Sequence, residues 1–190
     1  MSVAARGFTT IGHYRRSLEE FTGMLREAQV GLLVDVRAFP RSRSNPAFNI
    51  DRLPAALAPL HIGYRHAAAL GGRRPRQPGV DPRLNALWRV ESFHNYADYA
   101  LGPDFAAALD DLLRLGEAGR VALMCSEAVW WRCHRRIIAD HLVLAGRAVD
   151  HLMAPGRSEP ASPTPGARRT GDGKVIYPAD PPPGGWQAAG

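Results

Sequence analysis

The sequence contains very little cysteine and almost no lysine. The two cysteines among its 190 residues are Cys125 and Cys133, too few for the disulfide framework on which small secreted domains depend. Of the 24 basic residues, 23 are arginines and one is a lysine, Lys174. A catalytic Schiff base on a lysine side chain would therefore have to use Lys174.

Long apolar runs and the common nucleotide and metal motifs are also missing. No apolar stretch approaches the roughly 18 residues that a membrane-spanning helix needs, and residues 1–12 lack the apolar core of a signal peptide. We therefore expect a cytoplasmic protein without a membrane partner. The chain has no G-x-G-x-x-G, no Walker loop and no H-E-x-x-H, so we expect no cofactor and no classical dinucleotide site.

Positive charge is in excess. The net charge is +6 and the isoelectric point is near 10.0, which predicts a polyanionic partner, with nucleic acid as the first candidate. A GC-rich coding bias would explain the preference for arginine over lysine, but not the net excess. Arginines and aromatic residues also interleave, a pattern suited to phosphate binding and base stacking, at Arg41, Arg43 and Phe48, at Tyr64 and Arg65, at Arg73, Arg74 and Arg76, at Trp88 and Arg89, and at Trp130, Trp131 and Arg132.

The composition changes near residue 154. Hydrophobic residues make up 45% and charged residues 22% of the chain, ordinary values for a soluble domain with a core. Residues 154–190 are rich in proline and glycine and poor in large apolar residues, apart from Val175, Ile176, Tyr177 and Trp186, which could dock onto the domain. We predict a single domain over residues 1–153 and a flexible tail over residues 154–190.

Strand-like and helix-like patterns alternate along the predicted domain. The patterns predict strands at 6–11, 31–37, 121–125 and 148–153, of which 31–37 is a nearly continuous apolar run, and a short strand within 62–70 that ends before Gly71-Gly72. Apolar residues spaced three or four apart predict helices at 14–28, 51–59, 92–117 and 128–145, the third broken at Gly102-Pro103. The alternation predicts a three-layer α/β fold, with a mostly parallel, Rossmann-like sheet and helices on both faces.

Asp35 and Arg37 stand at the carboxyl end of a predicted buried strand. Being two residues apart, they point to the same face, and the guanidinium would keep a buried carboxylate ionised. One interpretation is an ion pair that braces the following loop. The other is a catalytic or substrate-orienting carboxylate beside an anion-binding arginine, and the location at the strand end favours it.

Cys125 and Glu127 end another predicted strand in the same way. Glu127 is either a charge at the start of the following helix or a general acid or base. Cys125 is either a small buried strand residue, which we favour, or an activated thiolate. Cys133 falls on the apolar stripe of the predicted helix 128–145, and His134 is either an acid, base or phosphate contact or a structural imidazole. Both cysteines with His134 and His13 could be imagined as zinc ligands, but the C-x7-C-H spacing matches no common ligand pair, so we predict no metal site.

Taken together, these segments resemble the bacterial and archaeal family catalogued as domain of unknown function 488 (DUF488). The resemblance covers residues 8–153 and rests on four ordered motifs: Thr10-Ile11-Gly12-His13; Leu33-Val34-Asp35-Val36-Arg37 with Pro40-Arg41-Ser42; Tyr64 with Leu70-Gly71-Gly72; and Leu123-Met124-Cys125-Ser126-Glu127 with Cys133-His134-Arg135. Tyr14 stands where the family's pattern leads us to expect a serine. The resemblance implies an α/β fold and a link to DNA base excision, including removal of a modified pyrimidine such as 5-hydroxymethyluracil.

We therefore expect a monofunctional DNA glycosylase that flips a modified base from duplex or single-stranded DNA. The predicted catalytic groups are Asp35 or Glu127, which would activate water or stabilise the sugar cation, with Arg37 and His134 balancing charge on the leaving base. The predicted substrate-binding residues are Gly12, His13, Arg41, Ser42, Tyr64, Gly71, Gly72, Arg73, Cys125, Trp130 and Arg135. The alternatives are a non-catalytic nucleic-acid-binding module and a small-molecule enzyme that uses Cys125. The sequence does not indicate an oligomeric state.

Overall fold

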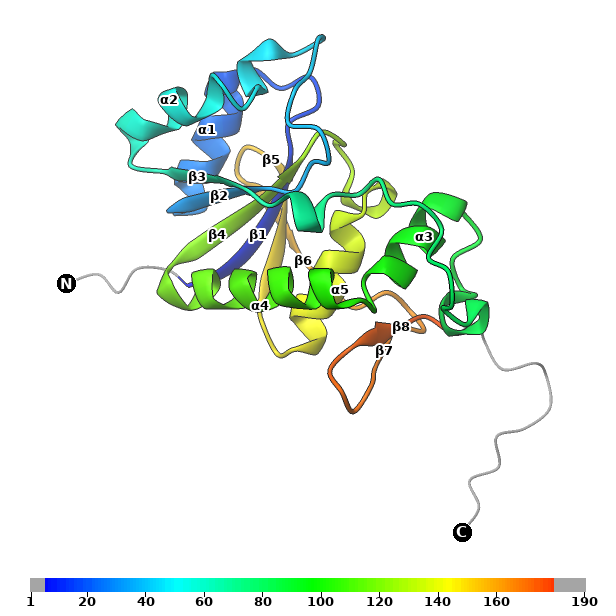
Figure 1. Ribbon diagram of the computed structural model, residues 1–190. Helices are drawn as coiled ribbons and strands as arrows, with labels where there is room; N and C mark the ends of the chain where they lie inside the picture. Colours follow the sequence, from blue (N-terminus) through cyan, green and yellow to red (C-terminus); the bar gives the residue numbers. More distant parts are fainter. Residues whose placement is uncertain (1–5, 180–190) are drawn as a thin grey trace.

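A six-stranded sheet with the strand order β3-β2-β4-β1-β5-β6 lies at the centre of the molecule (Figure 1). The computed structural model describes residues 6–179. Five strands are parallel, and β6 runs antiparallel to β5 at one edge. The strands are β1 (Gly7–Gly12), β2 (Leu32–Asp35), β3 (Gly63–His66), β4 (Arg120–Cys125), β5 (Val149–Ala154) and β6 (Arg157–Pro160).

Helices cover both faces of this sheet (Figure 1). One face packs against α1 (Leu18–Glu27) and α2 (Leu53–Leu57), and the other against α3 (Glu91–Tyr99), α4 (Pro103–Ala118) and α5 (Arg135–Leu144). Neighbouring residues of a strand serve opposite faces: Leu33 belongs to the first core and Val34 to the second. Burial on both faces explains the apolar runs. The predicted three-layer α/β fold is confirmed.

The helix boundaries follow local sequence signals. Ser17 caps α1, and its side chain accepts a hydrogen bond from the backbone N–H of Glu20. The predicted break at Gly102-Pro103 separates α3 from α4, because Pro103 is tolerated only in the first turn of a helix. At 16 residues α4 is the longest helix of the described chain. Within residues 6–179, no helix has the length and apolar character needed to cross a membrane.

The predicted helix 128–145 is wrong over its first third. Its helical part begins only at Arg135, and residues 126–134 form a loop with a short 3-10 turn at Trp130–Arg132. The ring of Trp130 stacks on His151 of β5, with centroids 4.2 Å apart, and Cys133 has extended backbone. Because Trp130 packs against β5, residues 126–134 do not continue the helix toward its N-terminus.

The predicted domain end at residue 153 is also wrong. Strand β6 pairs with β5, and a second, two-stranded sheet joins β7 (Arg168–Arg169) to β8 (Val175–Ile176). Tyr177 is fully buried, and its hydroxyl donates to Asp140 Oδ2 at 2.9 Å, so the docking expected for residues 175–177 is confirmed. Proline is compatible with an edge strand, where Pro160 lies. Trp186 and the rest of the proposed tail from residue 180 lie outside the described residues.

Candidate functional site

The carboxyl ends of three neighbouring strands meet at one point of the sheet. After β1 the chain turns to α1 on one face, whereas after the adjacent β4 it leads to α5 on the other face. Such a change of direction opens a crevice at the carboxyl edge of a parallel sheet, where ligands bind. Gly12 and Cys125 are paired across β1 and β4, and β2 lies on the other side of β4. Gly12-His13, Asp35 to Arg37 and Cys125 to Glu127 therefore lie at the same edge of the sheet.

A cavity of about 610 Å³ occupies this edge. Nine of the predicted site residues line it: His13, Arg37, Arg41, Ser42, Gly72, Arg73, Cys125, Glu127 and His134. Residues that were not among the predicted site residues complete the wall, notably Phe39, Ser44, Ser92, Phe93 and Arg132. The lining carries four arginines, and within the described chain Glu127 is its one carboxylate. The cavity is therefore suited to an anionic ligand.

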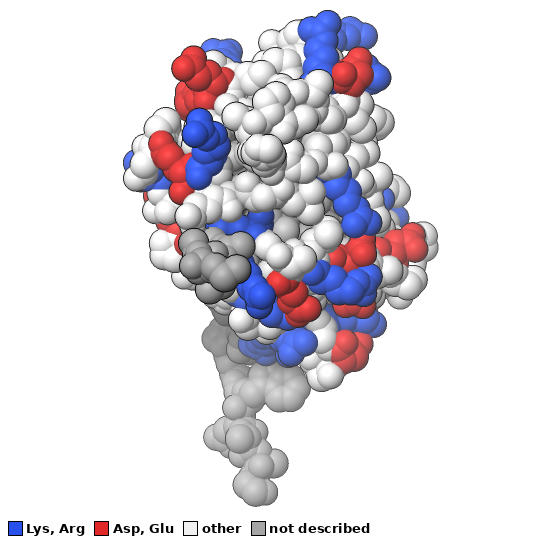
Figure 2. Space-filling model, turned by 90° about the vertical axis from the view of Figure 1, so that its left-hand side faces the viewer, with Lys and Arg blue, Asp and Glu red and all other residues white. Residues whose placement is uncertain are grey.

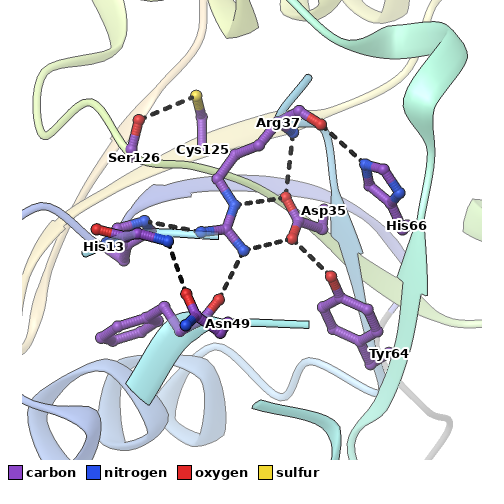
Figure 3. Close-up of polar contacts among 10 residues, drawn as sticks. His13, Asp35, Arg37, Asn49, Tyr64, His66, Cys125 and Ser126 are labelled. Atoms are coloured by element: carbon purple, nitrogen blue, oxygen red, sulfur yellow. Dashed lines mark hydrogen bonds and ion pairs between the residues drawn. The ribbon is translucent and has the colours of Figure 1, made fainter. Parts of the chain in front are cut away.

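A buried ion pair forms the floor of the site (Figure 3). Arg37 Nε donates to Asp35 Oδ1 at 2.9 Å and Nη2 donates to Oδ2 at 2.6 Å. Tyr64 donates its hydroxyl to the same Oδ2 at 2.6 Å. Asp35 has 0% exposure and is absent from the cavity wall, whereas Arg37 reaches it. Asp35 therefore lies behind Arg37, with both carboxylate oxygens occupied.

Pairing with Asp35 keeps Arg37 in its charged form despite its burial. Burial alone would lower the pKa of Arg37, but the hydrogen bonds and charge of Asp35 raise it above its ordinary value. Burial, followed by the bond to Asp35, raises the pKa of the Tyr64 hydroxyl. Tyr64 is thus a protonated donor, and its ring does not line the cavity. Tyr64 therefore supports Asp35 rather than contacting a ligand in the cavity.

His13 is a neutral neighbour of Arg37. Burial, and then the charge of Arg37, lower the pKa of His13 to about 4. Its Nε2 accepts from Arg37 Nη1 at 3.2 Å, and its ring stacks on Phe48 with centroids 4.6 Å apart. At neutral pH the His13 ring is therefore uncharged, and its Nε2 helps to hold Arg37 in place.

Glu127 is the carboxylate that faces the cavity. It is half-buried and follows β4 in the loop before α5. The interpretation of Glu127 as a helix-terminal charge is wrong, because α5 begins eight residues later, at Arg135. Gly12 explains why the loop lies so close: a Cβ there would come within 2.8 Å of the Glu127 carbonyl carbon. Arg135, buried at 1% exposure, fixes the loop by donating to the Glu127 carbonyl at 2.5 Å.

The two cysteines and His134 come together beside Glu127. His134 Nδ1 lies 3.6 Å from Cys133 Sγ, and Arg135 Nε donates to that sulfur at 3.3 Å. Burial alone would raise the pKa of Cys133, but the hydrogen bond from Cys125 and the charge of Arg135 lower it to about 6. The same hydrogen bond, and then burial, raise the pKa of Cys125 to about 12. Cys125 is a buried strand residue, as favoured from the sequence, while Cys133 presents its sulfur to polar groups.

The other predicted binding residues surround the cavity without lining it. Trp130 stacks on His151, and Gly71 packs against Ala38, whose Cα would lie 2.9 Å from an added Cβ. The exposed aromatic on the wall is Phe39, with 68% exposure and Arg73 positioned 5.7 Å from its ring centroid. The signal for Phe39 in the sequence is a large apolar residue placed in a polar loop directly after Arg37.

A second cavity, of about 640 Å³, lies between the β3 edge and α4. Its lining carries three arginines and two aspartates, and Asp111 pairs with both Arg65 and Arg114. Figure 2 shows the side of the molecule that lies to the left in Figure 1, where acidic and basic side chains are interspersed and no broad patch of one sign forms. The first cavity has four arginines and one carboxylate in its wall, and two of those arginines, Arg73 and Arg132, make no ion pair within the described residues, so it is the better candidate for a functional site.

Comparison with known proteins yields one match. No curated protein and no solved structure matches the chain. The model of a family described as "Domain of unknown function DUF488" matches residues 17–142. The matched range includes β2, β4 and most of α5, and thus the residues of the Asp35–Arg37 pair and of the loop from Cys125 to His134.

Proposed function

Since the chain belongs to the DUF488 family, whose description assigns no function, we propose one from the chemistry of the site: a monofunctional DNA glycosylase. The enzyme would take a modified pyrimidine, such as 5-hydroxymethyluracil, into the cavity by base flipping. It would then hydrolyse the bond between the base and its sugar. DNA is the partner that the excess of positive charge favours.

The observation that carries the proposal is the composition of the 610 Å³ cavity. Its volume is within the range of small-ligand sites, about 300–1,000 Å³. Arg41, Arg73 and Arg132 line it together with the exposed ring of Phe39. Guanidinium groups bind phosphates, and an aromatic ring stacks on any base. Phe39 replaces Tyr64 and Trp130 as the stacking residue of the proposal, because both of those rings are engaged elsewhere.

Glu127 is the proposed general base. It would take a proton from water while the water oxygen bonds to C1′ of the sugar and the electron pair of the breaking C–N bond leaves with the base. Arg37, held charged and immobile by Asp35, would stabilise the negative charge on the departing base. Asp35 is a positioning residue in this scheme, because its oxygens are bonded to Arg37 and Tyr64.

The lysine content supports a hydrolytic rather than an imine mechanism. Lys174 precedes β8 and pairs with Asp172 at 3.1 Å, and it is not among the cavity residues. A lyase reaction through a lysine imine would need an amine at the sugar. We expect abasic product without strand cleavage, and no covalent adduct in the presence of borohydride.

The test is incubation of the protein with duplex and single-stranded oligonucleotides that carry modified pyrimidines, with abasic sites as the readout. Replacing Glu127 by Gln should lower the rate by about 10²–10⁴-fold, the usual contribution of a general base. Glu117→Gln is the matched control, because Glu117 pairs with Arg147 on the surface away from the cavity. Full activity in Glu127→Gln would refute the assignment of the base.

The alternatives from the sequence give different results in the same assay. A nucleic-acid-binding module would bind DNA with strong salt dependence and release no base from any substrate. A small-molecule enzyme acting through Cys125 would show no salt-dependent DNA binding. The raised pKa of Cys125, about 12, weakens that second alternative, because the thiolate is the nucleophile.

A further inference from the structure

Cys125, Cys133 and His134 form a cluster that the proposed hydrolysis does not use. One donor atom from each lies within 4.8 Å of the other two. Cys125 ends β4, and the other two residues precede α5. The fold thus brings together residues that are separated in the sequence. In the folded chain, the unusual C-x7-C-H spacing is therefore no obstacle to metal ligation.

The distance between Cys133 and His134 suits one edge of a tetrahedral metal site. Zinc bonds of about 2.3 Å to sulfur and about 2.1 Å to nitrogen, at a tetrahedral angle, place the two donor atoms about 3.6 Å apart. Cys133 Sγ and His134 Nδ1 lie 3.6 Å apart. This pair could thus form one edge of a coordination tetrahedron without a change in backbone.

His134 is held in the form that a metal ligand needs. Its Nε2 lies 2.8 Å from the carbonyl oxygen of Val36, which can only accept a hydrogen bond, so Nε2 carries the proton. In the neutral ring, Nδ1 then presents a lone pair toward the sulfur atoms. A hydrogen bond from the far ring nitrogen to a backbone carbonyl is the usual support of a metal-bound histidine.

Gly72 leaves the lone pair of His134 accessible. A Cβ at Gly72 would come 2.6 Å from Cγ and 2.8 Å from Cε1 of His134, and it would also touch the Nδ1 between them. Contact with all three neighbouring ring atoms means that Gly72 lies over the face of the ring. The direction in the ring plane, along which a metal ion would bind Nδ1, is not covered by Gly72.

The charges of the three ligands match a divalent cation, and the positive charge of Arg135 lies beside them. Two thiolates neutralise a divalent cation, and the imidazole is uncharged. Arg135 donates to Cys133 Sγ at 3.3 Å, the kind of hydrogen bond that supports a metal-bound thiolate. The nearby charge of Arg37 is already offset by Asp35. Soft sulfur donors select zinc over magnesium or calcium.

We propose that Cys125, Cys133 and His134 bind a zinc ion whose fourth coordination position opens into the cavity. All three residues line that cavity. Three protein ligands with one open position are typical of catalytic rather than structural zinc sites. The open position would accept water or an anionic ligand. This inference stands apart from the glycosylase proposal, because its test measures metal binding and not base removal.

The test is a titration of the full chain, reduced and freed of metal, with Co²⁺ as a spectroscopic substitute for zinc. We expect one equivalent to give a sulfur-to-cobalt charge-transfer band and the visible bands of tetrahedral cobalt, and Zn²⁺ to displace it. Added azide should shift the visible bands by entering the open position. Bound cobalt should protect both thiols from alkylation.

Variants of the ligands decide between this cluster and an adventitious surface site. Cys125→Ser should lose about half of the charge-transfer intensity, and His134→Gln should weaken cobalt binding at least tenfold. His61→Asn is the control, because His61 is exposed and does not line the cavity, and this variant should bind cobalt normally. Circular dichroism checks that each variant is folded.

Three outcomes would overturn the proposal. The first is the absence of a charge-transfer band in the reduced wild-type protein. The second is unchanged cobalt binding in both ligand variants. The third is a Cys125–Cys133 disulfide formed with oxidised glutathione in a protein that takes up no cobalt when reduced, which would make the cysteines a redox pair instead. An unshifted spectrum with azide would refute the open fourth position.

Discussion

Arg37 connects the two interpretations of the strand end after β2. It braces the following loop, because Nη2 donates to the Phe48 carbonyl at 2.7 Å, and it also lines the cavity. Asp35 makes both possible by keeping the buried guanidinium neutralised. Arg37 thus belongs to the bracing ion pair and is also the candidate anion-binding group. Tyr64 supports the pair by its hydrogen bond to the Asp35 carboxylate.

Tyr64→Phe tests how strongly this support contributes. It removes a hydrogen bond to a charged acceptor, and we expect the free energy of unfolding to fall by about 1.5–3 kcal/mol. Tyr99→Phe is the matched control, since that half-buried hydroxyl donates to the neutral Ala69 carbonyl at 2.8 Å, and a loss of about 0.5–1.5 kcal/mol is expected. Urea denaturation measures both. Equal losses would mean that the charge of Asp35 adds nothing to the bond.

The site could be predicted from the sequence as far as strand geometry determines it. Asp35 with Arg37 and Cys125 with Glu127 follow parallel strands, whose carboxyl ends must share an edge. Which carboxylate faces the cavity could not be predicted, because that depends on Tyr64 reaching Asp35 from the next strand. The exposure of Phe39 was missed for a similar reason, since it depends on how the whole loop packs.

At the scale of elements, sequence patterns located the five parallel strands, missed β6, β7 and β8, and misplaced one helix start. The apolar stripe of α5 continues backwards through Cys133 to Trp130, so spacing alone predicts helix there. The structure uses Trp130 against His151 of β5 instead, a contact between segments far apart in the sequence. The resulting loop, residues 126–134, contains the candidate site residues Glu127 and His134. Its conformation depends on packing between distant segments, which a local sequence pattern cannot predict.

The segment after β5 offers a test of the corrected domain end. Tyr177→Ala removes a fully buried ring and the hydrogen bond to Asp140, so we expect a loss of about 3–5 kcal/mol in the free energy of unfolding. Lys174→Ala in the same segment breaks only an exposed ion pair with Asp172 and should change it by less than about 1 kcal/mol. Chemical denaturation of both variants measures the difference, and two equally small effects would show that the segment contributes little to stability.

At the scale of the whole molecule, three buried histidines make stability depend on pH. Burial is the largest cause that lowers the pKa of His13, His141 and His151 to about 4. The ring of His151 forms a hydrogen bond with Thr10 at 2.8 Å and stacks on Trp130, while His141 lies on α5 beside Phe105. The three rings are distributed between the site and the helical layer, so the effect belongs to the global unfolding of the molecule.

We predict that acidification from pH 7 to 5 destabilises the protein. An unfolded histidine binds its proton near pH 6.5 and these folded ones near 4, so the unfolded chain holds more protons between those values. The stabilisation is complete above pH 6.5 and is lost as the pH falls toward 4. At pH 5 each of these histidines then lowers the free energy of unfolding by about 2 kcal/mol relative to its value above pH 6.5. Denaturation at several pH values should show a shallower slope for His151→Gln and an unchanged slope for the exposed His61→Asn; identical slopes for the two variants would assign the acid sensitivity to other groups.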